Sequence, residues 1–335
     1  MTYPEERRKG MKKKLVMATA AVLATALFAG SSMAAEAKKN AYEEETRIGY
    51  LAVAIGDSVS AAWIKGIEKY LSSFSTITMD TYDGLSSVDT QVQIMDEMIE
   101  QQYDAILLQA VDMAGLGASV EKAEAAGIPV ITMNLDADAT HAGLVAMVDV
   151  EAGQLVAKAI GDALGGEGSV VIISATPGAT KGQYMDQGFR AEMEANYPGI
   201  EILDEQTGEW LTENANTVMN DFLTKYPDVN AVFCHNDAMA EGAAAAIEAA
   251  GKTGEIAVWG ADGETKMLEY IEQGLCTGTI YTNCTEQGAL AAQLAIYCIN
   301  SGITGADLSA TPTIKMSPIV VTADNVDTIT EDIRW

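Results

Sequence analysis

Short polar side chains stand at the ends of the apolar runs of this 335-residue chain. Most are carboxylates, amides and hydroxyls, and cations are almost absent among them. They are Asp57 after residues 51–55, Asp112 after 105–109, Asn134 and Asp136 after 129–133, Asn236 and Asp237 after 231–235, Asp262 after 257–261, and Thr282 and Asn283 after 277–281. If the runs are strands of open parallel sheets, this edge is where such sheets bind ligands.

These residue types suit an uncharged ligand rich in hydroxyls. A carboxylate accepts hydrogen bonds from hydroxyls, and charge-assisted bonds are the stronger kind. An amide both donates and accepts, which matches the dual role of a hydroxyl. The C–H face of a sugar packs on an aromatic ring, and Trp210 in the loop "TGEWLTEN" is a candidate for that ring. An ordinary core or surface tryptophan is the competing interpretation of Trp210.

Helix capping is a competing role for several of these carboxylates. Asp112 and Asp237 each precede a helical pattern, where an N-cap contributes ~1 kcal/mol. Asp57 or Ser58 could cap the next helix in the same way. Asn134 and Asp262 open no strong helical pattern, so capping explains them less well. We therefore expect Asp237 to cap its helix and Asn236 to point into a crevice.

Strand and helix patterns alternate along the chain, which indicates α/β architecture with parallel sheets. The series restarts near residue 150, and the segment 103–134 is echoed at 229–262. A late helix is expected at 286–302 and a last strand at 313–323. We expect the helix to return to the first lobe and the tail to return to the second, so neither lobe is one continuous segment. We predict two lobes, the first comprising residues 46–148 plus 284–312 and the second comprising residues 149–282 plus 313–335. Crossings near 145–149, 282–285 and 311–315 would form the hinge.

The first 34 residues read as a secretory signal peptide. Lys12, Lys13 and Lys14 precede an apolar run at 15–29, and "SMA" provides a cleavage site after Ala34. A membrane anchor is the alternative, although this run is shorter than the roughly 20 residues of a spanning helix. We hypothesise that residues 1–10 precede the true start of translation at Met11. The signal predicts a periplasmic or secreted protein, and no cysteine stands near it for lipid attachment.

Charge and cysteine content narrow the class of protein. The chain carries a formal net charge of −28, and residues 1–34 hold six of its basic and two of its acidic side chains, so the remainder is near −32. Such a chain repels nucleic acid and anionic lipid. The cysteines show no metal-binding spacing, and buried free thiols are favoured over disulfides: Cys234, Cys276, Cys284 and Cys298.

An enzyme is the first rival interpretation, and the sequence lacks the residue patterns that would support it. His141 and His235 are the two histidines, and neither belongs to a Ser-His-Asp, Cys-His or metal-ligand pattern. The Gly-rich "GDALGGEG" at 161–168 follows a helix and precedes a strand, which is the reverse of a phosphate-binding loop. It reads as a helix stop and a turn. We predict a binding protein without catalysis.

The motifs "HNDAMAEGAAAA" and "WGADG" resemble those of periplasmic sugar-binding proteins of ABC transporters, of the ribose/galactose type. The resemblance spans about residues 46–325. It implies the type I periplasmic binding protein fold: two Rossmann-like lobes with parallel sheets, joined by a three-strand hinge. It also implies ligand contacts at positions that match the family, namely Asp57, Asn134, Gln183, Trp210, Asn236, Asp262 and Thr282.

This chain also departs from the family pattern at several positions. Gln183 stands where the family usually has a sugar-binding arginine, and Val59 (or Ser60) replaces an aromatic residue. Asp136 joins the expected site through its place after a strand. No calcium loop is found between "GDALGGEG" and "SVVII", so we predict no metal and no cofactor.

The resemblance also implies partners. The ligand would be a monosaccharide of galactose, glucose or ribose type, and the closed form would dock on an ABC transporter permease. Two alternatives stay open: a sugar-sensing receptor component for a chemoreceptor or sensor kinase, and binding of a non-sugar polar solute on the same fold. We expect a monomer and no nucleic-acid partner, since a repressor of this fold would carry a helix-turn-helix where this chain has its signal.

Overall fold

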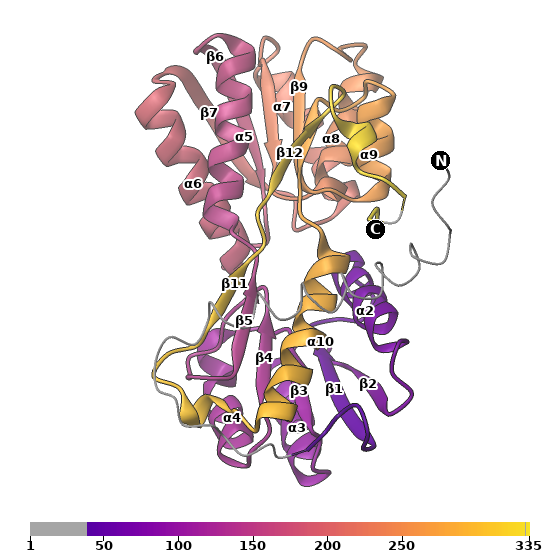
Figure 1. Ribbon diagram of the computed structural model, residues 1–335. Coiled ribbons are helices and arrows are strands. Elements are labelled where there is room, and N and C mark those ends of the chain that lie inside the picture. Colours follow the sequence, from indigo (N-terminus) through magenta and orange to yellow (C-terminus); the bar gives the residue numbers. More distant parts are fainter. Residues whose placement is uncertain (1–38, 332) are drawn as a thin grey trace, which may run out of the picture.

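The computed structural model describes residues 39–331 and 333–335, so the predicted signal peptide lies outside the described residues. Two α/β lobes stand end to end, each built on one six-stranded sheet (Figure 1). The prediction of two lobes with parallel sheets is therefore confirmed. Among the described strands, nine of the ten neighbouring pairs are parallel, and β12 (Ile319–Thr322) is antiparallel to β10 (Gly278–Tyr281).

The first lobe has the strand order β11-β5-β4-β3-β1-β2. Its strands are β1 (Thr46–Ala52), β2 (Ile77–Asp83), β3 (Ala105–Leu108), β4 (Val130–Met133), β5 (Gly143–Ala146) and β11 (Thr313–Lys315). Its helices are α2 (Ser58–Leu71), α3 (Val88–Glu100), α4 (Met113–Ala125) and α10 (Cys284–Ser301). Helix α10 packs on α2 and on the sheet, so the late helix returns to the first lobe as predicted.

The second lobe has the strand order β12-β10-β9-β8-β6-β7. Its other strands are β6 (Glu167–Ser174), β7 (Gly199–Thr207), β8 (Ala231–Cys234) and β9 (Ala257–Asp262). Its helices are α5 (Asp149–Leu164), α6 (Thr180–Asn196), α7 (Thr212–Lys225), α8 (Asp237–Ala249) and α9 (Thr265–Glu272).

Each sheet is buried on both faces, which is why its central strands read as continuous apolar runs. Alternate residues of a strand point to opposite faces. In β6, Val170 and Ile172 belong to the core under α5 and α6, whereas Val171 and Ile173 belong to the core under α7 and α8. A lone helix on one face would leave the other apolar face in water, so both layers are needed.

Three segments connect the lobes. Two of them join β5 to α5 and β10 to α10, where crossings were predicted. The third joins β11 to β12, because the single strand predicted at 313–323 is two strands in different sheets. Since β11 pairs with β5, residues Thr313–Lys315 belong to the first lobe, and the predicted boundary at residue 312 is three residues too early.

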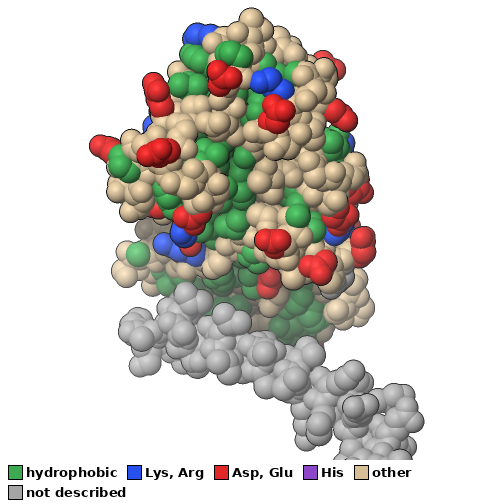
Figure 2. Space-filling view, turned by 90° about the horizontal axis from the view of Figure 1, so that it is seen from above, with side chains coloured by type: hydrophobic (Ala, Val, Ile, Leu, Met, Phe, Trp, Pro, Cys, Tyr) green, Lys and Arg blue, Asp and Glu red, His purple; other side chains and the backbone are tan. Residues whose placement is uncertain are grey.

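The surface charge and the state of the cysteines agree with what the composition predicts. Acidic side chains are spread over the end of the second lobe and outnumber basic ones there (Figure 2). All four cysteines are buried and free, as favoured from the sequence. Among the described residues, none of the helices combines the length and apolar character that crossing a bilayer requires.

Candidate ligand-binding site

A cleft of about 670 Å³ lies between the lobes, at the carboxyl ends of both sheets. The first lobe lines it from the loops after β3 and β4, and the second lobe from the starts of α5 and α6. Its polar lining residues are Gln109, Asn134, Asp136, Asp149, Glu151, Gln154, Thr180, Lys181, Tyr184 and Lys315. Asn134 and Asp136 thus lie where the sequence predicted them.

On the first lobe, Asp57 caps α2 and is part of a short polar chain. Its carboxylate accepts from the Ser60 amide at 2.6 Å and from the Ser60 hydroxyl at 2.8 Å. The Ser60 hydroxyl also lies 2.8 Å from Gln109 Oε1, which accepts from the Val53 amide at 2.9 Å. Asp57 is thus the N-cap of α2 and does not itself line the cleft, whereas Gln109, the far end of this network, does.

Asp136 faces the cleft beside a buried histidine. Its carboxylate lies 3.4 Å from Nε2 of His141, a residue with no solvent exposure. Burial lowers the pKa of His141, so the ring is neutral at pH 7. Its Nδ1 lies 2.9 Å from the carbonyl oxygen of Ala139 and its Nε2 lies 2.7 Å from the Thr132 hydroxyl. His141 is thus a satisfied core residue behind Asp136.

On the second lobe, Lys181 joins two predicted site residues. Its ammonium forms an ion pair with Asp262 and lies 5.7 Å from the centre of the Trp210 ring, within cation–π range. Burial raises the pKa of Asp262 to about 6, against the lowering effect of Lys181. Burial alone would lower the pKa of Lys181, but Asp262 and Asp149 raise it on balance, so Lys181 is charged.

Three predicted site residues have left-handed backbone. The φ angles are 68° at Asn134, 66° at Trp210 and 134° at Asp262. Such values are uncommon outside glycine and cost roughly 1–3 kcal/mol each, so they persist where the surroundings impose them. Backbone strain at three positions chosen for their chemistry supports a functional role for this edge of the sheets.

The expected roles of Asn236 and Asp237 are wrong, because Asn236 caps α8 and Asp237 lies inside the lobe. Asn236 is the N-cap of α8 and accepts from the Met239 amide at 2.9 Å. Asp237 is fully buried. It accepts from the amides of Gly263 at 2.7 Å and Glu264 at 2.8 Å, and from the Thr279 hydroxyl at 2.6 Å. Helix α8 begins one residue earlier than expected because these donors, distant in sequence, hold the carboxylate inside. Asp112, in contrast, caps α4 as predicted.

Asn236 and Thr282 connect to the Lys181–Asp262 pair through their neighbours. The residues that line the cleft do not include the predicted site residues Asp57, Trp210, Asn236, Asp262 and Thr282. The Asn236 amide donates to the Trp210 carbonyl oxygen at 3.4 Å, and the Thr282 amide donates to the Asp262 carbonyl oxygen at 3.1 Å. The hydroxyl of Ser58, next to Asp57, donates to Glu264 across the lobes at 2.7 Å.

Gln183 does not line the cleft. It is exposed and lines a separate cavity of about 230 Å³ that includes His235. Positions two apart on an α-helix point about 200° apart, so Gln183 and Lys181 leave α6 on opposite sides. Lys181 is therefore the cation at the cleft. Sequence reasoning missed it because the helical pattern is clear only from residue 187, about two turns after α6 begins at Thr180. The signal was present in "PGATKG", a glycine turn followed by a first helical turn.

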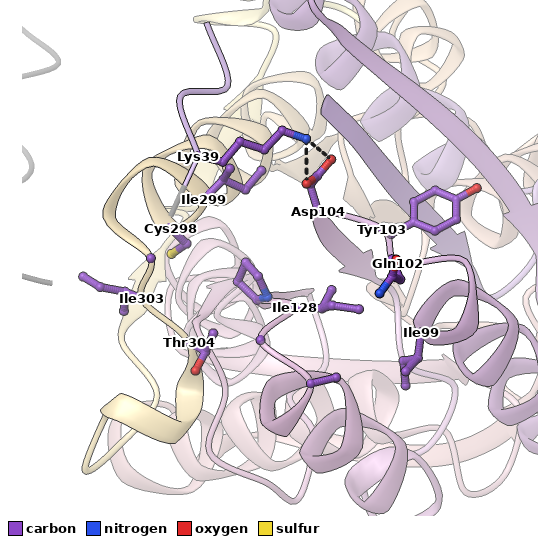
Figure 3. A pocket seen from close by; sticks show the side chains of 14 residues that line it. Lys39, Ile99, Gln102, Tyr103, Asp104, Ile128, Cys298, Ile299, Ile303 and Thr304 are labelled. Atoms are coloured by element: carbon purple, nitrogen blue, oxygen red, sulfur yellow. Dashed lines mark hydrogen bonds and ion pairs between the residues drawn. The ribbon is translucent and has the colours of Figure 1, made fainter. Parts of the chain in front are cut away.

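A second cavity, of about 280 Å³, lies at the other end of the first lobe. It is lined mainly by isoleucines and backbone at the ends of α3, α4 and α10. Lys39 and Asp104 point at each other across it at 2.9 Å, and the Tyr103 hydroxyl points away (Figure 3). Its charged groups are already paired with one another. The interlobe cleft is therefore the better candidate for a polar ligand.

Comparison with known proteins decides the family. A family model described as "Periplasmic binding protein domain" matches residues 48–302. The chain belongs to the periplasmic binding protein family. The xylitol-binding protein of Mycolicibacterium smegmatis is 31% identical over 85% of each chain. The ribose import binding protein RbsB of Bacillus subtilis is 30% identical over 76% of this chain and 81% of that protein.

A solved structure agrees with these sequence matches. An ABC transporter periplasmic solute-binding protein of Actinobacillus succinogenes 130z with bound D-allose has a TM-score of 0.76 and 29% identity, over 84% of this chain and 99% of that one. Periplasmic binding proteins are solute-binding proteins rather than enzymes, and the family implies a location outside the cytoplasm. Within the described residues, no group of three His, Cys, Asp or Glu side chains is placed to hold a metal ion.

Proposed function

We propose that this periplasmic binding protein captures a monosaccharide or a related neutral polyol between its lobes and delivers it to the permease of an ABC transporter. The observation that carries the proposal is the cleft of about 670 Å³ that brings Asn134 and Asp136 opposite Lys181. Carboxylate, amide and ammonium groups there are suited to hydroxyls, and the relatives and the solved neighbour are named for binding xylitol, ribose and allose.

We propose the following ligand contacts, in which residues that border the cleft join those that line it once the lobes close. Asp262 accepts from ligand hydroxyls, the Trp210 ring packs on the C–H face, and Asn134, Asp136 and Asp57 bind from the first lobe. Asn236 and Thr282 complete the site from their positions beside Trp210 and Asp262. Since the two sets lie on different lobes, both contact one ligand when the three connecting segments bend and the lobes close.

The test is a thermal-shift panel on residues 35–335, followed by calorimetry of every hit. The panel contains D-ribose, D-allose, D-xylose, D-glucose, D-galactose, xylitol and myo-inositol, with amino acids and nucleosides as unrelated solutes. A ligand at 100 times its dissociation constant adds about 2.7 kcal/mol to the folded state. A shift with a neutral sugar or polyol supports the proposal, and a shift with another class alone refutes it.

Transport and cellular placement complete the proposal. We expect the precursor to be cleaved after Ala34, the mature chain to be a periplasmic or released monomer, and the liganded form to stimulate the ATPase of its reconstituted transporter. Stimulation of a chemoreceptor or sensor kinase without any effect on the transporter ATPase would favour the sensory role. Light scattering of the mature chain tests the monomer, and mass analysis of the exported chain tests the cleavage site.

A further inference from the structure

Lys181 has hydrogen-bonding capacity that the protein leaves unused. An ammonium group has three N–H donors. Among the residues that the structure describes, Asp262 is its one hydrogen-bond acceptor. The side chain is 19% exposed, so bulk water has restricted access to the remaining donors. Lys181 also lines the cleft and approaches the Trp210 ring. A poorly hydrated donor at this place needs an acceptor from a bound molecule.

We propose that Lys181 contacts the ligand directly, and that Lys181 and Asp262 together hold one ligand hydroxyl beside the Trp210 ring. The ammonium donates to the hydroxyl oxygen, and the Asp262 carboxylate accepts the hydroxyl hydrogen. A hydroxyl fulfils both roles at once, whereas an ether oxygen or a C–H group cannot. This inference rests on the proposed function and assigns a specificity role to a residue two positions before Gln183.

The surrounding charges define the ligand class further. The positive charge of Lys181 is compensated by Asp262, to which it is paired, and by Asp149, which also acts on it. Glu264 lies close enough to Asp262 to raise the pKa of that carboxyl. Two carboxylates thus act on the ammonium and a third lies near Asp262, so the group has a negative excess. The site favours neutral polyhydroxyl compounds and disfavours sugar acids and sugar phosphates, whose charge would meet these carboxylates.

The opposite role for Lys181 makes a different prediction. If its ammonium merely covers Asp262 and the Trp210 ring in the unliganded protein, a sugar must displace it. Removing Lys181 would then strengthen binding. Direct contact predicts weaker binding, so the sign of the change in affinity distinguishes the two roles.

The first experiment compares Lys181→Met with Lys158→Met in the mature chain, residues 35–335. Lys158 is an exposed lysine of α5 in the same lobe, paired with Asp162 at 2.8 Å and absent from the cleft. Calorimetry uses the panel member with the largest thermal shift on the wild type. We expect Lys181→Met to raise the dissociation constant at least 10-fold and Lys158→Met to change it less than 2-fold. Unchanged or tighter binding by Lys181→Met overturns the inference.

The second experiment compares ligands within each protein, so a uniform loss of affinity in the variant does not affect its result. Each monodeoxy analogue of that sugar or polyol is titrated into the wild type and into Lys181→Met. We expect one deoxy position whose removal weakens binding at least 10-fold in the wild type and less than 3-fold in the variant. Equal losses at every position overturn the inference. D-Glucuronate and ribose 5-phosphate should bind the wild type at least 100-fold more weakly than D-glucose and D-ribose, if those sugars bind.

The outcomes for the two proposals are separable. If the wild type binds no neutral sugar or polyol, the proposed function fails and this inference fails with it. If the wild type binds a sugar but Lys181→Met binds it equally well, the inference alone fails.

Discussion

The indole Nε1 of Trp335 donates a hydrogen bond of 3.1 Å to the carbonyl oxygen of Thr282. Thr282 lies on the crossing between β10 and α10, so this contact ties residue 335 to the hinge. The Trp335 ring packs against the hydrophobic cores of both lobes, and its carbonyl oxygen accepts from the amide of Thr265 at 2.8 Å. One aromatic side chain thus connects the two lobes at the hinge.

Replacing Trp335 should loosen this junction. We expect Trp335→Ala to lower the free energy of unfolding by about 2 kcal/mol, less than the roughly 3–5 kcal/mol of a fully buried aromatic side chain, because Trp335 is half-buried. Trp335→Phe keeps the ring contacts and loses the hydrogen bond, so it should cost about 1 kcal/mol. Urea unfolding measures both. Equal stability of Trp335→Ala and the wild type would show that the ring is not a structural link.

Trp210 should contribute to binding through its ring face. We expect Trp210→Ala to weaken sugar binding several-fold or more and Trp210→Phe to weaken it less, because phenylalanine retains a smaller apolar face. Calorimetry with the sugar identified by the thermal-shift panel gives the affinities, and circular dichroism checks that each variant is folded. An affinity of Trp210→Ala within two-fold of the wild type would remove Trp210 from the site.

Gly263 should be required at the turn that follows Asp262. Its φ is 86°, and a Cβ at this position would lie 2.8 Å from the Tyr281 Cα. Gly263→Ala therefore combines strain with a backbone clash, and we expect a loss of more than about 2 kcal/mol in stability together with weaker sugar binding.

Gly254 is the matched control for Gly263. Its φ is 81°, but no atom outside its own chain neighbours lies within 4 Å of the Cβ position. Gly254→Ala should cost about 1 kcal/mol from strain alone and leave binding unchanged. If the two variants were equally stable, the contact with Tyr281 would be irrelevant to the fold.

Glu124 should make stability depend on pH. This carboxylate of α4 is buried, and accepts hydrogen bonds from the amides of Val130 at 2.8 Å, Ala142 at 2.7 Å and Gly305 at 2.6 Å. Burial outweighs these bonds and raises its pKa from 4.5 to about 6. The folded state then holds the proton more tightly than the unfolded state, so the contribution of Glu124 to stability falls as pH rises from 4.5 through 6.

The size of this effect is about 2 kcal/mol, since one pKa unit corresponds to about 1.36 kcal/mol. Glu124→Gln removes the titrating group, and the difference in stability between variant and wild type should shift in favour of the variant by that amount from pH 4.5 to pH 7. Glu121→Gln, at an exposed position of the same helix, should show no such shift. Parallel pH profiles for Glu124→Gln and the wild type would contradict the assignment.

The two-lobe α/β architecture could be predicted from the sequence. Buried parallel strands must be apolar on both faces, and covering helices must be amphipathic, so the alternation of the two patterns is visible without coordinates. The positions of Asn134, Asp136 and Asp262 at strand ends followed from the same reasoning, as did the capping role of Asp112.

Only the tertiary structure decided the contacts between residues that are distant along the chain. Asp237 lies inside because amides at 263–264 and the Thr279 hydroxyl surround it, and Asn236, the residue before it, is therefore the N-cap of α8. Lys181 reaches Asp262 because α6 begins about two turns before its amphipathic pattern becomes clear. The chain after 312 contributes strands to both sheets, and Trp335 joins both cores. Sequence periodicity reports which residues are buried in each element. It does not report which distant partners satisfy a buried polar group, because that depends on how the elements are packed.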